Sequence, residues 1–189
     1  MKNLVFCLEE PSAREMLEAL LPRLLPGEVN FRFIVFRGKQ DLEKQLVRRL
    51  RRWQTPDTAF VVLRDQDRAD CREVKKRLVE LCCRAGRPDT LVRVACRELE
   101  SFYLGDLEAV EKGLKLNGLA KKQRSRKFRD PDRLEQPSQE LARLASWRYQ
   151  KLAGSRAIAP YLRLEGNRSR SFTVLVSGLR RLAGVREET

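Results

Sequence analysis

The stretch FVVLRDQD, residues 60–67, joins an apolar run to two aspartates that stand one residue apart. An apolar run of this length, preceded by Pro56 and followed by polar residues, predicts a short buried strand. Side chains at positions i and i+2 of a strand point to the same side, so Asp65 and Asp67 are expected to aim at one point. Two crowded carboxylates repel each other, and a hard divalent cation such as Mg²⁺ would relieve that repulsion.

The first hundred residues alternate between short apolar runs and segments with helical periodicity. This alternation, with short connections, predicts an α/β fold: a mostly parallel four-stranded sheet with helices on both faces. Binding sites in such sheets form at the carboxyl ends of the strands. We expect strands at 4–8, 31–36, 58–63 and 90–95, and helices at 12–25, 41–53 and 70–85.

Basic residues are concentrated in the second part of the chain, which has a net charge of +14 overall. Residues 1–111 carry a net charge of only +2, whereas 112–133 carry +7 and 134–189 carry +5. We therefore expect an α/β domain at 1–111 and a small basic helical C-terminal extension at 112–189 that packs on it, the two forming one compact unit. An extended or mobile loop is expected to open this extension, followed by two or three short helices.

The basic surplus favours a polyanionic partner, of which nucleic acid is the commonest, although solubility or contact with an acidic protein would give the same composition. Phe128 lies within the basic stretch, where it would either stack on an unpaired base or pin the loop to the core. The side chains expected to contact backbone phosphates are Lys39, Lys121, Lys122, Arg124, Arg126, Lys127, Arg129 and Arg168.

The composition also excludes several classes of function. The chain contains no histidine, which excludes Ser-His-Asp and Cys-His hydrolysis and histidine-ligated zinc. Its five cysteines are odd in number and form no C-x-x-C pair, so we expect reduced thiols in a cytoplasmic protein. We expect no membrane partner and no signal peptide, because no apolar run approaches the roughly 20 residues of a spanning helix and the N-terminus shows no cleavage site.

Acidic residues follow three of the four predicted strands. Each group alone has a structural explanation: Asp67 or Asp70 could cap the next helix, and the glutamates could lie in exposed loops or at helix starts. That explanation does not extend to Asp65, which interrupts an apolar run where a carboxylate is partly desolvated. The groups expected at this edge of the sheet are Glu9 with Glu10, Asp65 with Asp67, and Glu98 with Glu100.

A glutamate after the first strand and Asp-x-Asp after the third resembles the TOPRIM fold of topoisomerases, bacterial primases and OLD-type nucleases. More closely, the chain is similar over nearly its whole length to the TOPRIM-like family called domain of unknown function 4276. The similar stretches are FCLEEPSAREMLEALLPRL (6–24), LRDQDRADCREVKKRLVEL (63–81), RVACRELESFYLGDLEAVEKG (93–113), and GSRAIAPYL (154–162) followed by NRSRSF (167–172).

The resemblance implies roles for individual residues. Glu9 matches the TOPRIM glutamate, and Asp65 and Asp67 match the Asp-x-Asp pair, so these three are expected to be catalytic and to hold Mg²⁺ or Mn²⁺. The glycine that usually follows the glutamate is replaced by Glu10, which leaves the geometry of that turn open. Two further metal ligands are implied at Glu98 and Glu100.

The leading hypothesis for function is Mg²⁺-dependent phosphodiester cleavage of nucleic acid, in the manner of a nuclease. The resemblance adds an expected role in phage defence, where small TOPRIM-like proteins are often associated with SMC/ABC- or AAA-type ATPases. The alternative is therefore a non-catalytic regulatory subunit that binds metal or nucleotide and works with such an ATPase partner. A third interpretation is a plain nucleic-acid-binding protein with a relict acidic site.

Overall fold

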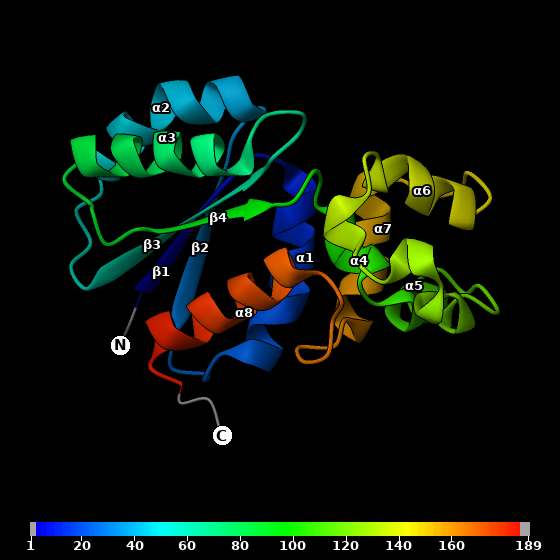
Figure 1. Cartoon of the computed structure of the whole chain (residues 1–189). Helices are drawn as coiled ribbons and strands as arrows, with labels where there is room; N and C mark the ends of the chain where they lie inside the picture. Colours follow the sequence, from blue (N-terminus) through cyan, green and yellow to red (C-terminus); the bar gives the residue numbers. More distant parts are fainter. Residues whose placement is uncertain (1–2, 186–189) are drawn as a thin grey trace.

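A four-stranded sheet lies at the centre of residues 3–185, the part of the chain that this computed structural model describes (Figure 1). The strand order is β2-β1-β3-β4, and all three pairings are parallel, which confirms the predicted α/β fold. The register aligns Leu8 with Leu63, so that β3 extends past the end of β1. The strands are β1 (Asn3–Leu8), β2 (Asn30–Val35), β3 (Thr58–Asp65) and β4 (Leu91–Ala95).

Helices cover both faces of the sheet, as predicted, because alternate strand residues supply apolar side chains to each face. Val5 and Cys7 of β1 pack with α2 and α3, whereas Leu4 and Phe6 pack with α1 on the other face. The three helices are α1 (Pro11–Leu24), α2 (Lys39–Arg51) and α3 (Cys71–Arg84). Within residues 3–185 no helix is long and apolar enough to cross a membrane.

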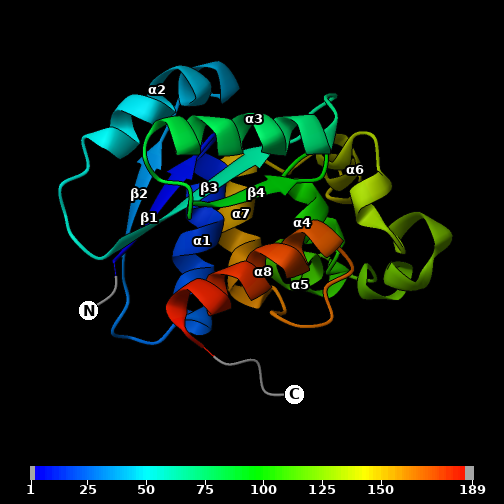
Figure 2. The ribbon, with the colours of Figure 1, turned by 60° about the vertical axis from the view of Figure 1, so that its left-hand side comes forward.

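Helix α8 (Arg170–Ala183) completes the face that α1 begins, opposite α2 and α3 (Figure 2). Its Val174 carbonyl accepts a hydrogen bond of 3.1 Å from Nε of Arg93 in β4. Gly178 lets α8 approach the strand, because a Cβ there would lie 2.6 Å from the Arg93 guanidinium. A helix in the basic extension is therefore also a layer of the α/β sandwich.

The remaining helices gather beyond the carboxyl ends of the strands (Figure 1). They are α4 (Glu100–Leu104), α5 (Leu107–Gly113), α6 (Pro137–Leu144), α7 (Lys151–Ile158) and a short 3₁₀ turn, η4 (Ala159–Tyr161). The prediction of an extended or mobile loop at 117–137, between α5 and α6, is wrong, because the segment contains three 3₁₀ turns, η1 (Ala120–Arg124), η2 (Arg126–Phe128) and η3 (Pro131–Arg133).

Buried contacts explain why the basic segment is ordered. The Phe128 ring is buried, which favours pinning the segment to the core over stacking on a base. The side-chain amide of Gln123 donates hydrogen bonds to the carbonyls of Leu104 and Phe128, at 3.1 and 3.0 Å. A basic composition predicted an exposed loop, but the buried Phe128 ring and the hydrogen bonds of Gln123 hold this segment to the helical group.

The contact between α5 and α7 depends on a glycine. A Cβ at Gly113 would lie 2.5 Å from the Ala157 carbonyl oxygen and 2.7 Å from Cα of Ile158, both backbone atoms. We expect Gly113→Ala to destabilise the protein by about 1–3 kcal/mol, because the helices must move apart. Gly27→Ala is the matched control, since no atom lies within 4 Å of its Cβ position. Thermal unfolding measures both, and equal melting temperatures would contradict this packing.

Candidate metal centre at the carboxyl end of the sheet

The register of the central strands brings Glu9 beside the end of β3. The Glu9 backbone N–H continues the ladder by donating to the carbonyl of Leu63 at 3.3 Å. Its side chain then turns toward β3, where Oε2 accepts a hydrogen bond of 3.0 Å from the Asp65 backbone N–H. Glu9 and Asp65, two of the residues predicted to be catalytic, are therefore joined directly, although they are far apart in sequence.

Glu9 is only 7% exposed and lies 3.8 Å from Nε of Arg64, a buried cation that also pairs with Glu43 of α2. Burial raises the pKa of the Glu9 carboxyl, and nearby Asp67 adds to that effect. The hydrogen bond from the Asp65 N–H and the charge of Arg64 oppose the rise without cancelling it. Glu9 is thus a carboxylate whose charge is only partly compensated by the protein.

Asp65 is the last residue of β3 and is 8% exposed. Its carboxylate accepts no hydrogen bond from any residue in 3–185. Burial raises the pKa of this carboxyl well above its ordinary value, and the charges of Glu100, Glu10 and Glu9 raise it further. Only Lys151 acts in the opposite direction. Asp65 therefore carries the least compensated charge at this edge of the sheet, with three other carboxylates around it.

Glu100 opens α4 and is 1% exposed. Its Oε1 accepts a hydrogen bond of 3.1 Å from the Tyr149 hydroxyl, whereas Oε2 is buried and has no hydrogen-bond partner among the described residues. Burial raises the pKa of Glu100, and the charge of Lys151 opposes this. An unpaired carboxylate oxygen beside Asp65 is a free ligand position of the kind that a hard cation requires.

Lys151, the first residue of α7, supplies the positive charge of this cluster. Its Nζ lies 3.1 and 3.4 Å from the two carboxylate oxygens of Glu10. Partial burial works to lower the pKa of Lys151, but the charges of Glu100 and Glu10 outweigh it and raise that pKa above its ordinary value. Glu10 itself has a φ of −128°, an extended conformation open to any residue, so the turn has no need of the glycine that it replaces.

Asp67 has different neighbours from Asp65, contrary to the expectation from strand alternation. β3 ends at Asp65, and Asp67 has a left-handed φ of 57°, with its N–H donating to the Arg97 carbonyl at 2.8 Å. Alternation of side chains requires extended backbone, so the i and i+2 rule does not reach Asp67. Its carboxylate lies 2.7 Å from Nζ of Lys39, the lysine predicted to contact phosphate.

Of the other acidic residues at this edge, one caps a helix and others line a cleft. Asp70 caps α3 by accepting hydrogen bonds from two N–H groups of its first turn, so the capping explanation is right for Asp70 and does not apply to Asp67. Glu98 accepts a hydrogen bond of 2.7 Å from the Ser138 N–H at the start of α6. Glu98 and Asp67 line a cleft of about 400 Å³, whereas Glu100 belongs to the buried group around Asp65.

The predicted phosphate contacts in the basic extension lie at the surface of η1, η2 and the loops that follow. Lys127 pairs with Glu140 of α6 at 2.7 Å, and the backbone N–H of Arg168 donates to the Gly105 carbonyl at 2.9 Å. The residues of this set that are exposed are Lys121, Lys122, Arg124, Arg126, Lys127, Arg129 and Arg168.

Sequence reasoning missed two residues that contact the acidic cluster, Lys151 and Tyr149. Tyr149 lies between α6 and α7 and Lys151 is the first residue of α7, and the Lys151–Glu10 contact joins residues 141 positions apart. One signal in the sequence marks this segment: residues 141–164 contain five basic side chains and no acidic one. A cation from such a segment is available to compensate carboxylates elsewhere in the fold.

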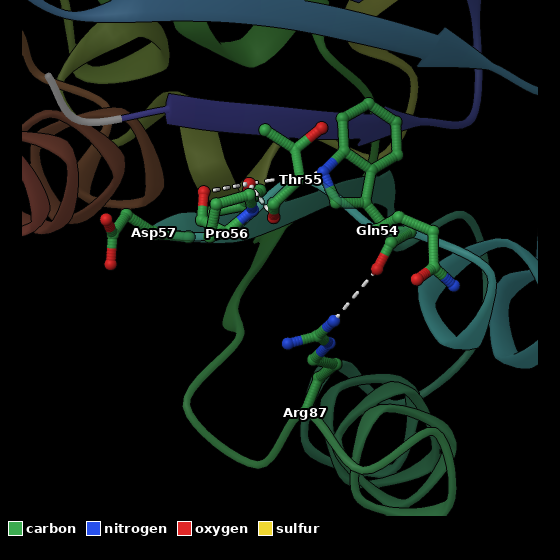
Figure 3. Close-up of a pocket in the computed structure, with 8 residues that line it drawn as sticks. Gln54, Thr55, Pro56, Asp57 and Arg87 are labelled. Atoms are coloured by element: carbon green, nitrogen blue, oxygen red, sulfur yellow. Dashed lines mark hydrogen bonds between the residues drawn. The ribbon is translucent and has the colours of Figure 1, made fainter.

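A second hollow, of about 600 Å³, lies at the opposite end of the sheet, where β3 begins (Figure 3). Arg87 donates a hydrogen bond of 3.2 Å to the Trp53 carbonyl there, and the Trp53 indole donates to Thr58 at 3.1 Å. Asp57 is the one carboxylate among the residues that line it. The acidic residues of the predicted site are all at the other end.

The donor set fits a hard divalent cation in its chemistry. All the candidate ligands are carboxylate oxygens, and the unpaired Oε2 of Glu100 and the unbonded carboxylate of Asp65 provide free donor atoms. Within residues 3–185, however, no three Cys, Asp or Glu side chains are arranged to hold one ion. The metal site therefore stays a prediction, which requires the side chains to close around the ion.

The sequence profile of a family described as Domain of unknown function (DUF4276) matches residues 8–180. The chain belongs to this family. Its structure is similar to the C-terminal region of the Burkholderia pseudomallei OLD protein, with a TM-score of 0.52, 16% sequence identity, and coverage of 95% of this chain and 98% of that one. This member of the DUF4276 family thus has a TOPRIM-like fold, as predicted. No curated protein matches the chain.

Proposed function

We propose that the protein cleaves phosphodiester bonds of nucleic acid with the help of Mg²⁺ or Mn²⁺, and that Glu9, Asp65 and Asp67 are its catalytic metal ligands. One observation carries this proposal: Asp65 is a largely buried residue whose carboxylate accepts no hydrogen bond within residues 3–185 and has other carboxylates around it. Such a charge is costly to bury unless a proton or a cation compensates it. A divalent cation would compensate several of these carboxylates at once.

The cation would activate a water molecule and stabilise the charge that develops on the phosphoryl oxygens. Glu100 would add the buried Oε2 as a further ligand, because no described residue uses that atom. Glu98 is the weaker candidate, since its Oε2 already accepts the Ser138 N–H. Asp67 would have to release Lys39, which frees that lysine for a phosphate of the substrate.

Lys151 is positioned to act on the scissile phosphate. It is half-buried beside Glu10, Glu100 and Asp65, so its charge lies where a phosphate held at the carboxylates would sit. A positioned cation stabilises the additional negative charge of the transition state more than that of the ground state. The exposed basic residues of η1 and η2 would contact the backbone at a distance and give an affinity that falls with salt.

The direct test compares the wild-type chain with Asp65→Ala/Asp67→Ala on DNA and RNA, with Mg²⁺ or Mn²⁺. We expect cleavage that requires metal and that falls by about 10³-fold or more in the double variant, since both charges are lost. The matched control is Glu28→Ala/Glu80→Ala, which makes the same change of net charge at two exposed carboxylates away from the cluster. This control should cleave like the wild type.

Equal cleavage by the wild type and by Asp65→Ala/Asp67→Ala would refute the assignment of the site. An inert wild-type chain that co-purifies with an SMC/ABC- or AAA-type ATPase would support the regulatory alternative, and with it the expected setting in phage defence. Binding of nucleic acid that is the same with and without divalent metal, again without cleavage, would support a binding protein with a relict site.

A further inference from the structure

The turn between α6 and α7, which leads to Tyr149 and Lys151, exposes a large aromatic side chain. Trp147 is 68% exposed, whereas the largest aromatic residues of the core, such as Phe102 and Phe172, are fully buried. Its indole makes no hydrogen bond or ring contact with any other residue in 3–185. A tryptophan left this open carries the greatest apolar surface that a single residue can offer to a ligand.

The backbone that presents Trp147 is strained. Ser146 and Trp147 both have left-handed φ values, 50° and 62°, and the Trp147 N–H closes the turn on the Ala142 carbonyl at 2.6 Å. Left-handed conformations cost non-glycine residues of order 1–3 kcal/mol each, and a bulky residue is rare there. Glycine ends helices in this conformation without that cost. A tryptophan stands at position 147, where glycine would be more stable, which indicates that the exposed ring has a functional role such as contact with a ligand.

Trp147 is held close to the candidate site by the residue two positions later. The Tyr149 hydroxyl binds Glu100, and the Tyr149 ring packs against Gly154, where a Cβ would lie 2.1 Å from the ring. Two residues of extended chain span at most about 7 Å. The backbone of Trp147 therefore lies within about 7 Å of the backbone of Tyr149, whose hydroxyl contacts Glu100. The same segment of chain continues to Lys151.

The charge around Trp147 suits a polyanion. Arg148 is exposed, and its guanidinium makes no hydrogen bond or ion pair within residues 3–185. The segment 141–164 has no acidic residue to repel a phosphate. A flat aromatic ring next in sequence to an unpaired cation matches a ligand that combines planar faces with negative charge, and a nucleic-acid strand has both.

We propose that Trp147 stacks on an unpaired base of a nucleic-acid strand whose backbone phosphate lies at the carboxylate cluster. The substrate class is then single-stranded nucleic acid, or nucleic acid with unpaired bases, because a base inside a duplex offers no free face. This inference rests on the proposed function for the position of the phosphate. Stacking of one base on an aromatic side chain is worth about 1–3 kcal/mol, which corresponds to about a 5- to 150-fold change in affinity.

The chain provides its own fluorescent reporter, because it contains two tryptophans and the other one, Trp53, lines the hollow at the opposite end of the sheet. In Trp53→Phe the fluorescence comes from Trp147 alone. We expect a short oligothymidine strand, added with Ca²⁺ in place of Mg²⁺ or Mn²⁺ so that the carboxylates are compensated, to quench that fluorescence. An abasic strand of equal length and charge and a duplex of equal length should quench it little and bind at least several-fold more weakly.

A second variant makes the test independent of whether Trp53→Phe folds. Trp147→Ala in the wild-type background should bind the oligothymidine strand about 10-fold or more weakly by fluorescence anisotropy of a labelled strand, and bind the abasic strand unchanged. Equal affinity of the wild type for oligothymidine and the abasic strand would overturn the proposal. Self-association of the wild-type chain that is lost in Trp147→Ala, measured by sedimentation, would also overturn the proposal, because the ring would then contact a second copy of the chain.

The results that would reject the proposed nuclease function differ from those that would reject base stacking by Trp147. Quenching by single strands in Ca²⁺, together with no cleavage in Mg²⁺ or Mn²⁺, would keep the stacking role of Trp147 and reject the nuclease. Cleavage that requires Asp65 but is unchanged in Trp147→Ala on single strands and duplexes alike would keep the nuclease and reject the stacking role.

Discussion

Asp65→Asn should reduce metal-dependent cleavage by about 10³-fold or more and, at neutral pH, make the protein more stable than the wild type. The loss of activity follows because an amide binds a divalent cation far more weakly than a carboxylate does. The gain in stability follows because the wild-type carboxylate is buried without a hydrogen bond beside Glu100, Glu10 and Glu9. A neutral amide removes that repulsion and can donate to these neighbouring carboxylates.

The sign of the pH dependence follows from the raised pKa of Asp65. In the unfolded chain this carboxyl titrates near its ordinary value of 3.8, whereas the folded state raises its pKa well above that value. The folded state therefore binds the proton more tightly, so the stability of the wild type falls as the pH rises from 3.8 through the raised pKa. Below 3.8 the group is protonated in both states, and the contribution of its charge disappears.

Thermal unfolding of Asp65→Asn and of the wild type, from about pH 3 to about pH 8, measures this effect. We expect the variant to gain about 1–3 kcal/mol at neutral pH, or about 2–4 °C in melting temperature for each kcal/mol, and to lose the advantage in acid. Mg²⁺ should raise the melting temperature of the wild type but not that of the variant. The control is Asp89→Asn, at an exposed turn. A variant that is less stable at neutral pH, or equally stabilised by Mg²⁺, would refute our account of Asp65.

Lys151→Met should lower cleavage by about 100-fold or more and should also lower the melting temperature. The methionine keeps much of the apolar stem but removes the charge that opposes the repulsion among Glu10, Glu100 and Asp65. The carboxylates would then hold their protons more tightly, so fewer of them would be ionised at neutral pH. The variant therefore has the opposite effect on stability from Asp65→Asn, although both reduce activity.

Folding raises the pKa of Lys151 as well, so stability again falls with rising pH, but here the charged form is the one that stabilises the fold. Its pKa in the folded state lies above the ordinary value of 10.5, so its stabilising contribution is fully present below pH 10.5 and is lost as the pH rises through the raised pKa. The difference in melting temperature between wild type and Lys151→Met should persist through neutral pH and narrow above 10.5. Lys44→Met, at an exposed position of α2, is the control. Unchanged cleavage or a higher melting temperature in Lys151→Met would contradict the role given to Lys151.

The alternation of strands and helices was predictable because it depends on local patterns. The run at 60–63 is apolar throughout because β3 is covered on both faces, and the helices repeat apolar residues on the side that packs on the sheet. The location of α8 was not predictable in the same way, although its periodicity marked a helix. Its packing against β4 depends on contacts such as Arg93 with Val174, which join residues 81 positions apart.

In the candidate site, too, local sequence patterns predicted some residues, whereas others depend on contacts between distant parts of the chain. Parallel strands end at one edge, so the sequence could place Glu9, Asp65 and Glu100 there before any contact was known. Strand alternation could not describe Asp67, because a left-handed residue beyond the end of β3 directs its carboxylate to Lys39. Nor did local patterns connect Lys151 with Glu10, since that pair forms only when α7 packs beside α1.

By itself, then, the sequence determined a parallel α/β sheet of TOPRIM-like type and the edge at which its acidic residues gather, because periodicity and short connections act between near neighbours. The tertiary structure alone decided which charges meet. It left the largely buried Asp65 without a hydrogen bond to its carboxylate, set Lys151 among the carboxylates, and exposed Trp147 on the turn that leads to Tyr149 and Lys151. Electrostatic interactions act through space rather than along the chain, so only the folded backbone could fix these neighbours.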